Sequence, residues 1–172
     1  MTRLQPVLLV LGIAALLVAP IGQGNYIVYT LCSWLLFSIA AMGLNLTLGY
    51  AGQVSLAQAA FMGIGAYITS LMTLAGIHWG LAAIISIAAS FAVGLVLGYP
   101  ALRVQHHFLA FVTLAFNTLL FLVLRNEEKI TGGSFGLSGM ERPSFFGFST
   151  DSNMAFYYFS LACFLVAAFV LW

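Results

Sequence analysis

The sequence predicts an all-α, polytopic helical membrane protein with about six spans and a broken helix near residues 49–54. Its 172 residues are 63% hydrophobic and only 5% charged, whereas soluble domains carry roughly 25% charged residues. No Lys, Arg, Asp or Glu occurs between Arg3 and Arg103, and the next charge is Arg125. So few charged side chains cannot cover a water-facing surface, and a soluble domain is therefore excluded.

Six apolar runs give the expected spans. They cover residues 6–19, 26–46, 55–75, 79–99, 108–124 and 154–172. Each except the first approaches the roughly 20 residues that a bilayer core requires. Tyr26, Trp79 and Tyr99 lie at expected span ends, where interfacial aromatic residues are common. The last span runs to Trp172 without a polar flank, so we expect the chain to be the N-terminal part of a longer protein or a shortened form of one.

The first span has an alternative interpretation as a signal peptide. Arg3 would supply its positive region and residues 7–18 its apolar region. A cut after Ala19 would place Leu17 three residues from the cleavage point and Pro20 just beyond it, and both residues disfavour cleavage. More apolar spans also follow. A retained, short span that Pro20 ends is therefore preferred.

The stretch GYAGQVSLAQ, residues 49–58, contains two glycines and no charge between two apolar runs. Ser55 and Gln58 have the S-x-x-Q spacing of a capping box, which predicts a new helix within two or three residues of Ser55. Backbone that is not helical cannot face lipid at membrane depth. The stretch is therefore either an ordinary interfacial loop, which the residues alone favour, or an inward turn that lines a cavity.

The fourth span carries small residues at every fourth position. These are Ala82, Ser86, Ser90, Gly94 and Gly98. Such a stripe lets another helix approach closely, so helix packing is favoured over a pore lining. In the fifth span, Thr113 and Asn117 share one helix face. Hydrogen bonding to another helix is favoured over substrate contact for this pair.

No catalytic or metal-binding pattern is readable, and no cofactor is expected. Cys32 and Cys163 lie far apart in apolar runs, which is typical of structural thiols. His106 and His107 point to different sides of a helix and would chelate a metal poorly, so we assign them no role. The spans contain no carboxylate pair or Ser–His–Asp set, and the chain has no basic stretch to bind nucleic acid. An enzyme is not expected.

Residues 125–153 carry seven of the nine charges and form the expected aqueous loop. Within it, ITGGSFGLSG at 130–139 is glycine-rich but lacks the lysine of a Walker A loop, G-x-x-x-x-G-K-[ST]. Two interpretations stay open. The segment is a flexible turn, or it is a contact for a delivery protein or an outer gate.

Three motifs carry a resemblance to a known family. They are GLNLTLGYAGQVSLAQAAFMGIGAYI at 43–68, ALRVQHHFLAFVTLAF at 101–116 and ITGGSFGLSGM at 130–140. In this order and spacing the chain resembles the permease subunit of branched-chain amino acid ABC importers. The resemblance covers essentially the whole chain, and it implies that residues 1–172 form one transmembrane permease domain with further spans beyond.

The resemblance also implies partners, location and a path. The partners are a second permease subunit, two ATPase subunits and a periplasmic substrate-binding protein. The chain itself would be a multi-pass protein of the bacterial inner membrane, in contact with membrane lipid. Charge alone does not settle topology, but the family implies an inside N-terminus and a periplasmic 125–153 loop. Candidate path residues carried over from the family are Asn45, Gln53, Ser55 and Gln58, to which we add Thr113 and Asn117.

Two alternatives to an amino acid importer remain. Related permeases for urea or short amides share these motifs, and the substrate cannot be read from residues that line a path without tight binding. The second alternative is a membrane scaffold subunit that transports nothing.

Overall fold

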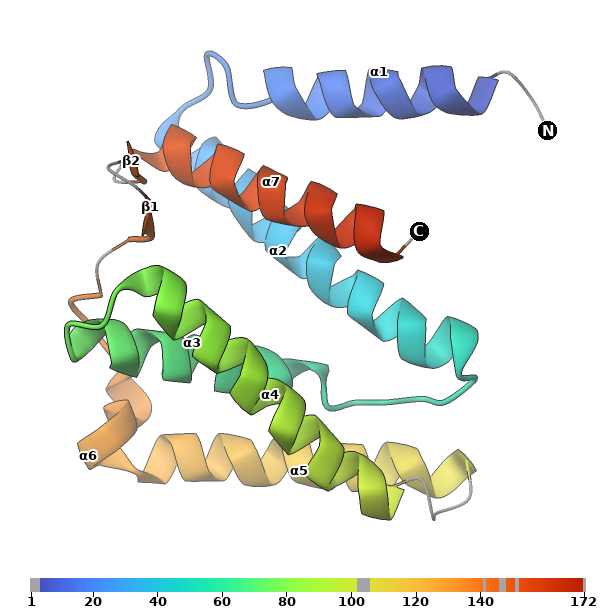
Figure 1. The fold of residues 1–172 in the computed structure, drawn as a ribbon, viewed down its shortest axis with the longest axis vertical. Coiled ribbons are helices and arrows are strands. Elements are labelled where there is room, and N and C mark those ends of the chain that lie inside the picture. Colours follow the sequence, from blue (N-terminus) through green and yellow to red (C-terminus); the bar gives the residue numbers. More distant parts are fainter. Residues whose placement is uncertain (1–3, 102–105, 141, 146–147, 151, 172) are drawn as a thin grey trace. The chain divides into compact units, whose positions relative to one another are not determined.

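The structure is a computed structural model that describes residues 4–101, 106–140, 142–145, 148–150 and 152–171. Figure 1 shows a chain built almost entirely of helices. The helices are α1 (Leu4–Val18), α2 (Asn25–Asn45), α3 (Gln58–Leu74), α4 (Trp79–Ala101), α5 (His106–Asn126), α6 (Glu128–Thr131) and α7 (Asn153–Leu171). A π-helical turn, η1 (Leu46–Tyr50), continues α2, and a 3-10 turn, η2 (Gly133–Phe135), follows α6. The strands β1 (Ser144–Phe145) and β2 (Phe148–Ser149) have two residues each and pair with one another.

Each of the six predicted spans coincides with a long helix, so the predicted class is confirmed. Four helical runs in the described chain are long and apolar enough to cross a membrane: Asn25–Tyr50, Trp79–Tyr99, Leu109–Asn126 and Asn153–Leu171. The helix α3 is apolar but has 17 residues, because it begins at Gln58 rather than at Ser55. The side chains of His106 and His107 lie outside the described part of the structure.

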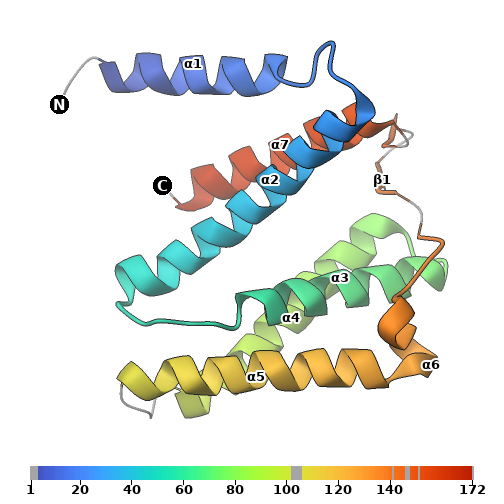
Figure 2. The same ribbon diagram turned by 180° about the vertical axis from the view of Figure 1, so that it is seen from behind.

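The helices belong to two compact units. The first unit comprises residues 1–42 and 148–172, and the second comprises residues 43–147. In the first unit α2 and α7 lie side by side (Figures 1 and 2). Their contact forms a small apolar core of Val28, Cys32, Leu35, Tyr157 and Leu161.

Two tyrosines of α7 bind the C-terminal end of α1 within the first unit. The carbonyl of Leu16 would normally accept from the amide four residues later, but that residue is Pro20, which has no N–H. The Tyr157 hydroxyl donates to the Leu16 carbonyl at 2.7 Å instead, and the Tyr158 hydroxyl donates to the next carbonyl at 3.2 Å. The proline that ends the helix therefore creates the acceptor that α7 satisfies.

The second unit packs α3 between two other helices. On one side, the Ser86 hydroxyl of α4 donates to the Gly65 carbonyl of α3 at 3.0 Å. On the other side, the rings of Phe61 (α3) and Phe116 (α5) have centroids 5.8 Å apart. Figure 2 shows α3 and α5 side by side, with α6 at one end of the pair. This arrangement places the irregular segment before α3 beside the first turns of α5.

Candidate functional site

The polar break between α2 and α3 is a π-helical turn followed by non-helical chain. In the turn, the Ala51 amide donates to the Leu46 carbonyl at 3.3 Å, and the Gln53 amide donates to the Thr47 carbonyl at 3.0 Å. Gly52 then has φ of +63°, in the left-handed region that favours glycine. Residues 51–57 contain no helix. The predicted break near residues 49–54 is therefore confirmed.

The start of α3 agrees with the prediction, but its cap does not. The helix begins at Gln58, three residues after Ser55, and its N-cap is Ala57, without a side-chain hydrogen bond. The Ser55 hydroxyl accepts from the Ala57 amide at 3.5 Å instead. The predicted capping box between Ser55 and Gln58 is therefore wrong.

A tertiary hydrogen bond explains why the local capping motif is not used. The Leu56 amide donates to the Thr113 hydroxyl of α5 at 2.9 Å. Thr113 is buried, and its hydroxyl in turn donates to the carbonyls of Leu109 and Ala110 at 3.0 and 3.1 Å. The bond ties the chain to α5 at Leu56, in a segment that is not helical, and helical winding starts at Gln58.

A cavity of about 200 Å³ lies beside this hydrogen bond. Its lining residues come from the break and from α3, α4 and α5. They are Thr47, Gln53, Ser55, Phe61, Gly94, Leu97, Gly98, Leu109 and Thr113. Three predicted path residues, Gln53, Ser55 and Thr113, thus meet at one cavity. Its polar groups are neutral, and its walls are apolar.

The other three predicted path residues are not among the lining residues of this cavity. Asn45 folds back on the π-helical turn, since its Oδ1 lies 2.9 Å from the position that a Cβ on Gly49 would occupy. The Gln58 side chain reaches back to the end of α2, with Nε2 2.9 Å from an added Cβ on Gly43. Asn117 is half-buried one turn beyond Thr113 on α5.

The small residues of α4 divide between two environments. Ala82 and Ser86 are buried, and Ser86 bonds to α3. Ser90 is half-buried. A Cβ on Gly94 would lie 3.8 Å from the Phe61 ring, and one on Gly98 would meet no heavy atom within 4 Å. The first part of the stripe therefore packs against α3, while its two glycines also line the cavity.

Sequence reasoning did not select four of the lining residues, which are Thr47, Phe61, Leu97 and Leu109. Thr47 gave the clearest signal, because it is a polar residue next to the glycine-containing break. The other three are apolar residues in apolar helices, and nothing in the sequence distinguishes them from residues that face lipid. Among the described residues, no three His, Cys, Asp or Glu side chains form a group that could hold a metal ion.

Comparison with known proteins identifies the family. Residues 26–172 match the family described as the permease component of the branched-chain amino acid transport system. This chain belongs to the branched-chain amino acid transport permease family. It is therefore a multi-pass membrane protein of a transport permease family, in agreement with its apolar helices.

Two curated relatives in this permease family are both named high-affinity branched-chain amino acid transport system permease protein LivM. The Escherichia coli protein is 34% identical over 129 residues, which cover 74% of this chain and 30% of that protein. The Salmonella typhimurium protein is 34% identical over 114 residues, which cover 66% of this chain and 27% of that protein. The permease chain described here thus spans less than a third of either relative. No solved structure matches it.

Proposed function

We propose that this chain is part of the permease subunit of an ABC importer for branched-chain or similar hydrophobic amino acids in the bacterial inner membrane. The observation that carries the proposal is the cavity whose lining includes Gln53, Ser55 and Thr113, three residues with neutral polar side chains. Neutral polar groups solvate a passing amino acid without holding it tightly. The names of the two relatives support this substrate class.

The proposed mechanism is alternating access driven by ATP hydrolysis in separate subunits. A carrier driven by an ion gradient would need an ionisable side chain at membrane depth, and the sequence has no Lys, Arg, Asp or Glu between Arg3 and Arg103. The proposed partners are a second permease subunit, two ATPase subunits and a periplasmic binding protein. Broken helices beside a cavity are a common device in transporters, and the break at residues 51–57 fits this use.

The same proposal includes the arrangement of the chain in the membrane. Residues 1–172 would act as one transmembrane permease domain, and the loop at 125–153 would be aqueous and periplasmic. Asn45, Gln58 and Asn117 remain candidate path residues outside the lining of this cavity. They would come to line the path in the complete permease or in another state of the transport cycle.

The test is Gln53→Leu in the full-length permease, reconstituted with its ATPases and binding protein. If the cavity lines the path, uptake of labelled leucine falls by roughly 5-fold or more, the factor that about 1 kcal/mol represents. Assembly and ATP hydrolysis should stay normal. Gln23→Leu is the matched control, because Gln23 is an exposed glutamine in the turn after α1.

Other outcomes would change the interpretation. Normal uptake in Gln53→Leu would make the break an ordinary interfacial loop. Failure of assembly would make the glutamine structural and place the path elsewhere. Uptake of urea or short amides by the wild-type complex, but not of leucine, would favour the alternative substrate class. A wild-type complex that transports none of these compounds would favour a scaffold subunit.

A further inference from the structure

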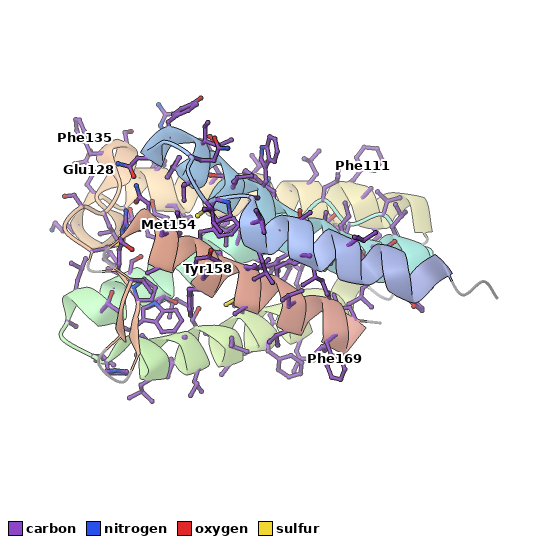
Figure 3. All side chains as sticks on the ribbon, turned by 90° about the horizontal axis from the view of Figure 1, so that it is seen from above. Phe111, Glu128, Phe135, Met154, Tyr158 and Phe169 are labelled. Atoms are coloured by element: carbon purple, nitrogen blue, oxygen red, sulfur yellow. The ribbon has the colours of Figure 1, made fainter. Side chains whose placement is uncertain are left out.

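A second cavity, of about 400 Å³, lies at the opposite end of the α3–α5 pair. Its lining residues come from α3, from the last turns of α5 and from the glycine-rich loop. They are Tyr67, Phe121, Leu124, Arg125, Gly133 and Ser134. Figure 3 shows this end of the second unit, where Glu128 and Phe135 lie, while Phe111 lies towards the other end of α5. With the topology proposed above, the cavity opens on the periplasmic side.

The loop that closes this cavity is fixed in place by one buried threonine. The Thr131 hydroxyl contacts the carbonyls of Leu124 and Glu127, and it accepts from the Gly133 amide at 3.2 Å. These bonds fold the chain back over the C-terminal end of α5. Ser134 is thereby held near Arg125, the last residue but one of that helix.

Glycine geometry maintains the same fold. Gly132 has φ of +74°, and a Cβ there would lie 2.2 Å from the Gly136 carbonyl oxygen. Gly133 has φ of +57°, and a Cβ there would lie 3.1 Å from the Arg125 carbonyl oxygen. The segment is therefore a tightly built turn, in which Gly132 and Gly133 leave no space for a side chain.

The chemistry of the lining is that of a receptor for a small carboxylate. Arg125 is the one charged residue among the lining residues, and no carboxylate of the described chain lies within ion-pair distance of its guanidinium. A guanidinium carries five N–H donors in a planar fork that matches a carboxylate. Tyr67 and Ser134 add hydroxyl groups, and Phe121 and Leu124 supply an apolar wall.

We propose that this cavity is an entry site, in which Arg125 binds the α-carboxylate of the amino acid while Phe121 and Leu124 contact its apolar side chain. The inference rests on the proposed function and adds a site to it. Arg125 is the last residue but one of α5, so its charge lies at the end of a span and not at membrane depth. A lipid phosphate could bind to the same guanidinium. The experiment therefore distinguishes an amino acid carboxylate from a lipid phosphate as its ligand.

The experiment measures direct binding of labelled leucine to the full-length permease complex without its binding protein. The complex is placed in nanodiscs of phosphatidylcholine, with and without phosphatidylglycerol. Wild-type complex should bind leucine in both lipids, and leucinamide, which has no carboxylate, should compete poorly. Arg125→Gln should weaken binding by roughly 10-fold or more, as expected for loss of a charge-assisted hydrogen bond. Arg125→Lys should retain part of the affinity for leucine.

Lys129→Gln is the matched control, because Lys129 is an exposed cation four residues away that does not line the cavity. It should bind leucine as the wild type does. Should Arg125→Gln fail to assemble, protection of wild-type Arg125 from phenylglyoxal gives an independent measurement by mass spectrometry. Leucine should protect Arg125, and leucinamide should not.

Several results would overturn the proposal. If Arg125→Gln binds leucine with wild-type affinity, the proposal is wrong. It is also wrong if Lys129→Gln loses as much affinity for leucine as Arg125→Gln does, because the effect is then one of general surface charge. Protection of Arg125 by phosphatidylglycerol alone would assign the guanidinium to lipid. If the wild-type complex transports leucine but Arg125 is neither protected by it nor needed to bind it, the entry site is refuted and the proposed function stands. If the wild-type complex neither binds nor transports leucine, the proposed function fails as well.

Discussion

At the scale of single residues, Thr113 connects the broken segment to α5. Its hydroxyl accepts from the Leu56 amide at 2.9 Å and also lies at the cavity. One side chain therefore has a structural role, as the acceptor for an amide outside regular secondary structure, and a place in the candidate path. The sequence favoured a hydrogen bond to another helix for this residue. The bond observed instead goes to the non-helical segment before α3.

We predict that Thr113→Val destabilises the permease. Valine has nearly the same shape but no acceptor, so the Leu56 amide loses its partner, at a cost of about 1–3 kcal/mol. The expected result is a lower Tm of the purified complex, by roughly 2–4 °C per kcal/mol. The control is Thr118→Val, because the Thr118 hydroxyl donates to the Leu114 carbonyl of its own helix. Equal Tm values in the two variants would contradict the role assigned to the Leu56 bond.

A second residue-scale prediction concerns the end of α1. Tyr157 is fully buried, and its hydroxyl supplies the donor that Pro20 cannot give to the Leu16 carbonyl. Tyr157→Phe should cost about 1 kcal/mol, the usual size of such a bond between helices in a membrane. Thermal unfolding of the purified complex checks this, with Tyr29→Phe as a control at an exposed position. A variant as stable as the control would show that this bond contributes nothing measurable.

At the scale of elements, the stripe of small residues explains how α4 and α3 approach closely. The Ser86 hydroxyl donates directly to the Gly65 carbonyl, and a Cβ added at Gly65 would already be in van der Waals contact with that hydroxyl, 3.6 Å away. Further along α4, a Cβ added to Gly94 would already be in van der Waals contact with the Phe61 ring of α3, 3.8 Å away. Packing of this kind replaces the hydrophobic effect, which does not drive helices together in lipid.

Gly94→Leu should therefore impair folding or assembly. The added atoms beyond Cβ would enter the space of the Phe61 ring, and overpacking costs about 1–3 kcal/mol. The amount of assembled complex in membranes, measured after solubilisation, should fall. Gly12→Leu in α1 is the control, because a Cβ on Gly12 meets no heavy atom within 4 Å. Wild-type amounts of the Gly94→Leu complex would indicate a lipid-facing or pore-facing surface.

At the scale of the whole molecule, topology decides which cavity faces the periplasm. In chain order, α3, α4 and α5 run forward, back and forward again (Figure 2), so the break before α3 and the loop after α5 belong at opposite membrane faces. Charge alone leaves the direction open, since cations occur on both sides of the predicted arrangement. The family resemblance implies an inside N-terminus.

Cysteine labelling in intact cells tests this direction. Lys129→Cys should react with a membrane-impermeant maleimide, while Ala51→Cys should react only after the membrane is permeabilised. Both positions are exposed. The parent chain is the control, because Cys32 and Cys163 lie within α2 and α7. The reverse pattern would invert the topology and place the Arg125 cavity on the cytoplasmic side.

The sequence by itself determined the class, the approximate spans and the helix break. These features depend on the order of residues along the chain: a run of apolar residues has to be helical in lipid, and the polar, glycine-containing stretch at 49–58 separates two such runs. The family also followed from linear motifs. For the same reason, the sequence located the start of α3 to within three residues.

Only the tertiary structure decided how the candidate site is assembled. The Leu56–Thr113 bond joins residues 57 positions apart, and it prevails over the capping box that the local sequence predicts. Gln53, Ser55 and Thr113 meet at one cavity while Asn45 and Gln58 turn elsewhere, and Arg125 lines a second cavity because Thr131 folds the glycine-rich loop back over α5. In each case the outcome depends on which groups become neighbours once helices pack, and linear spacing contains no such distances.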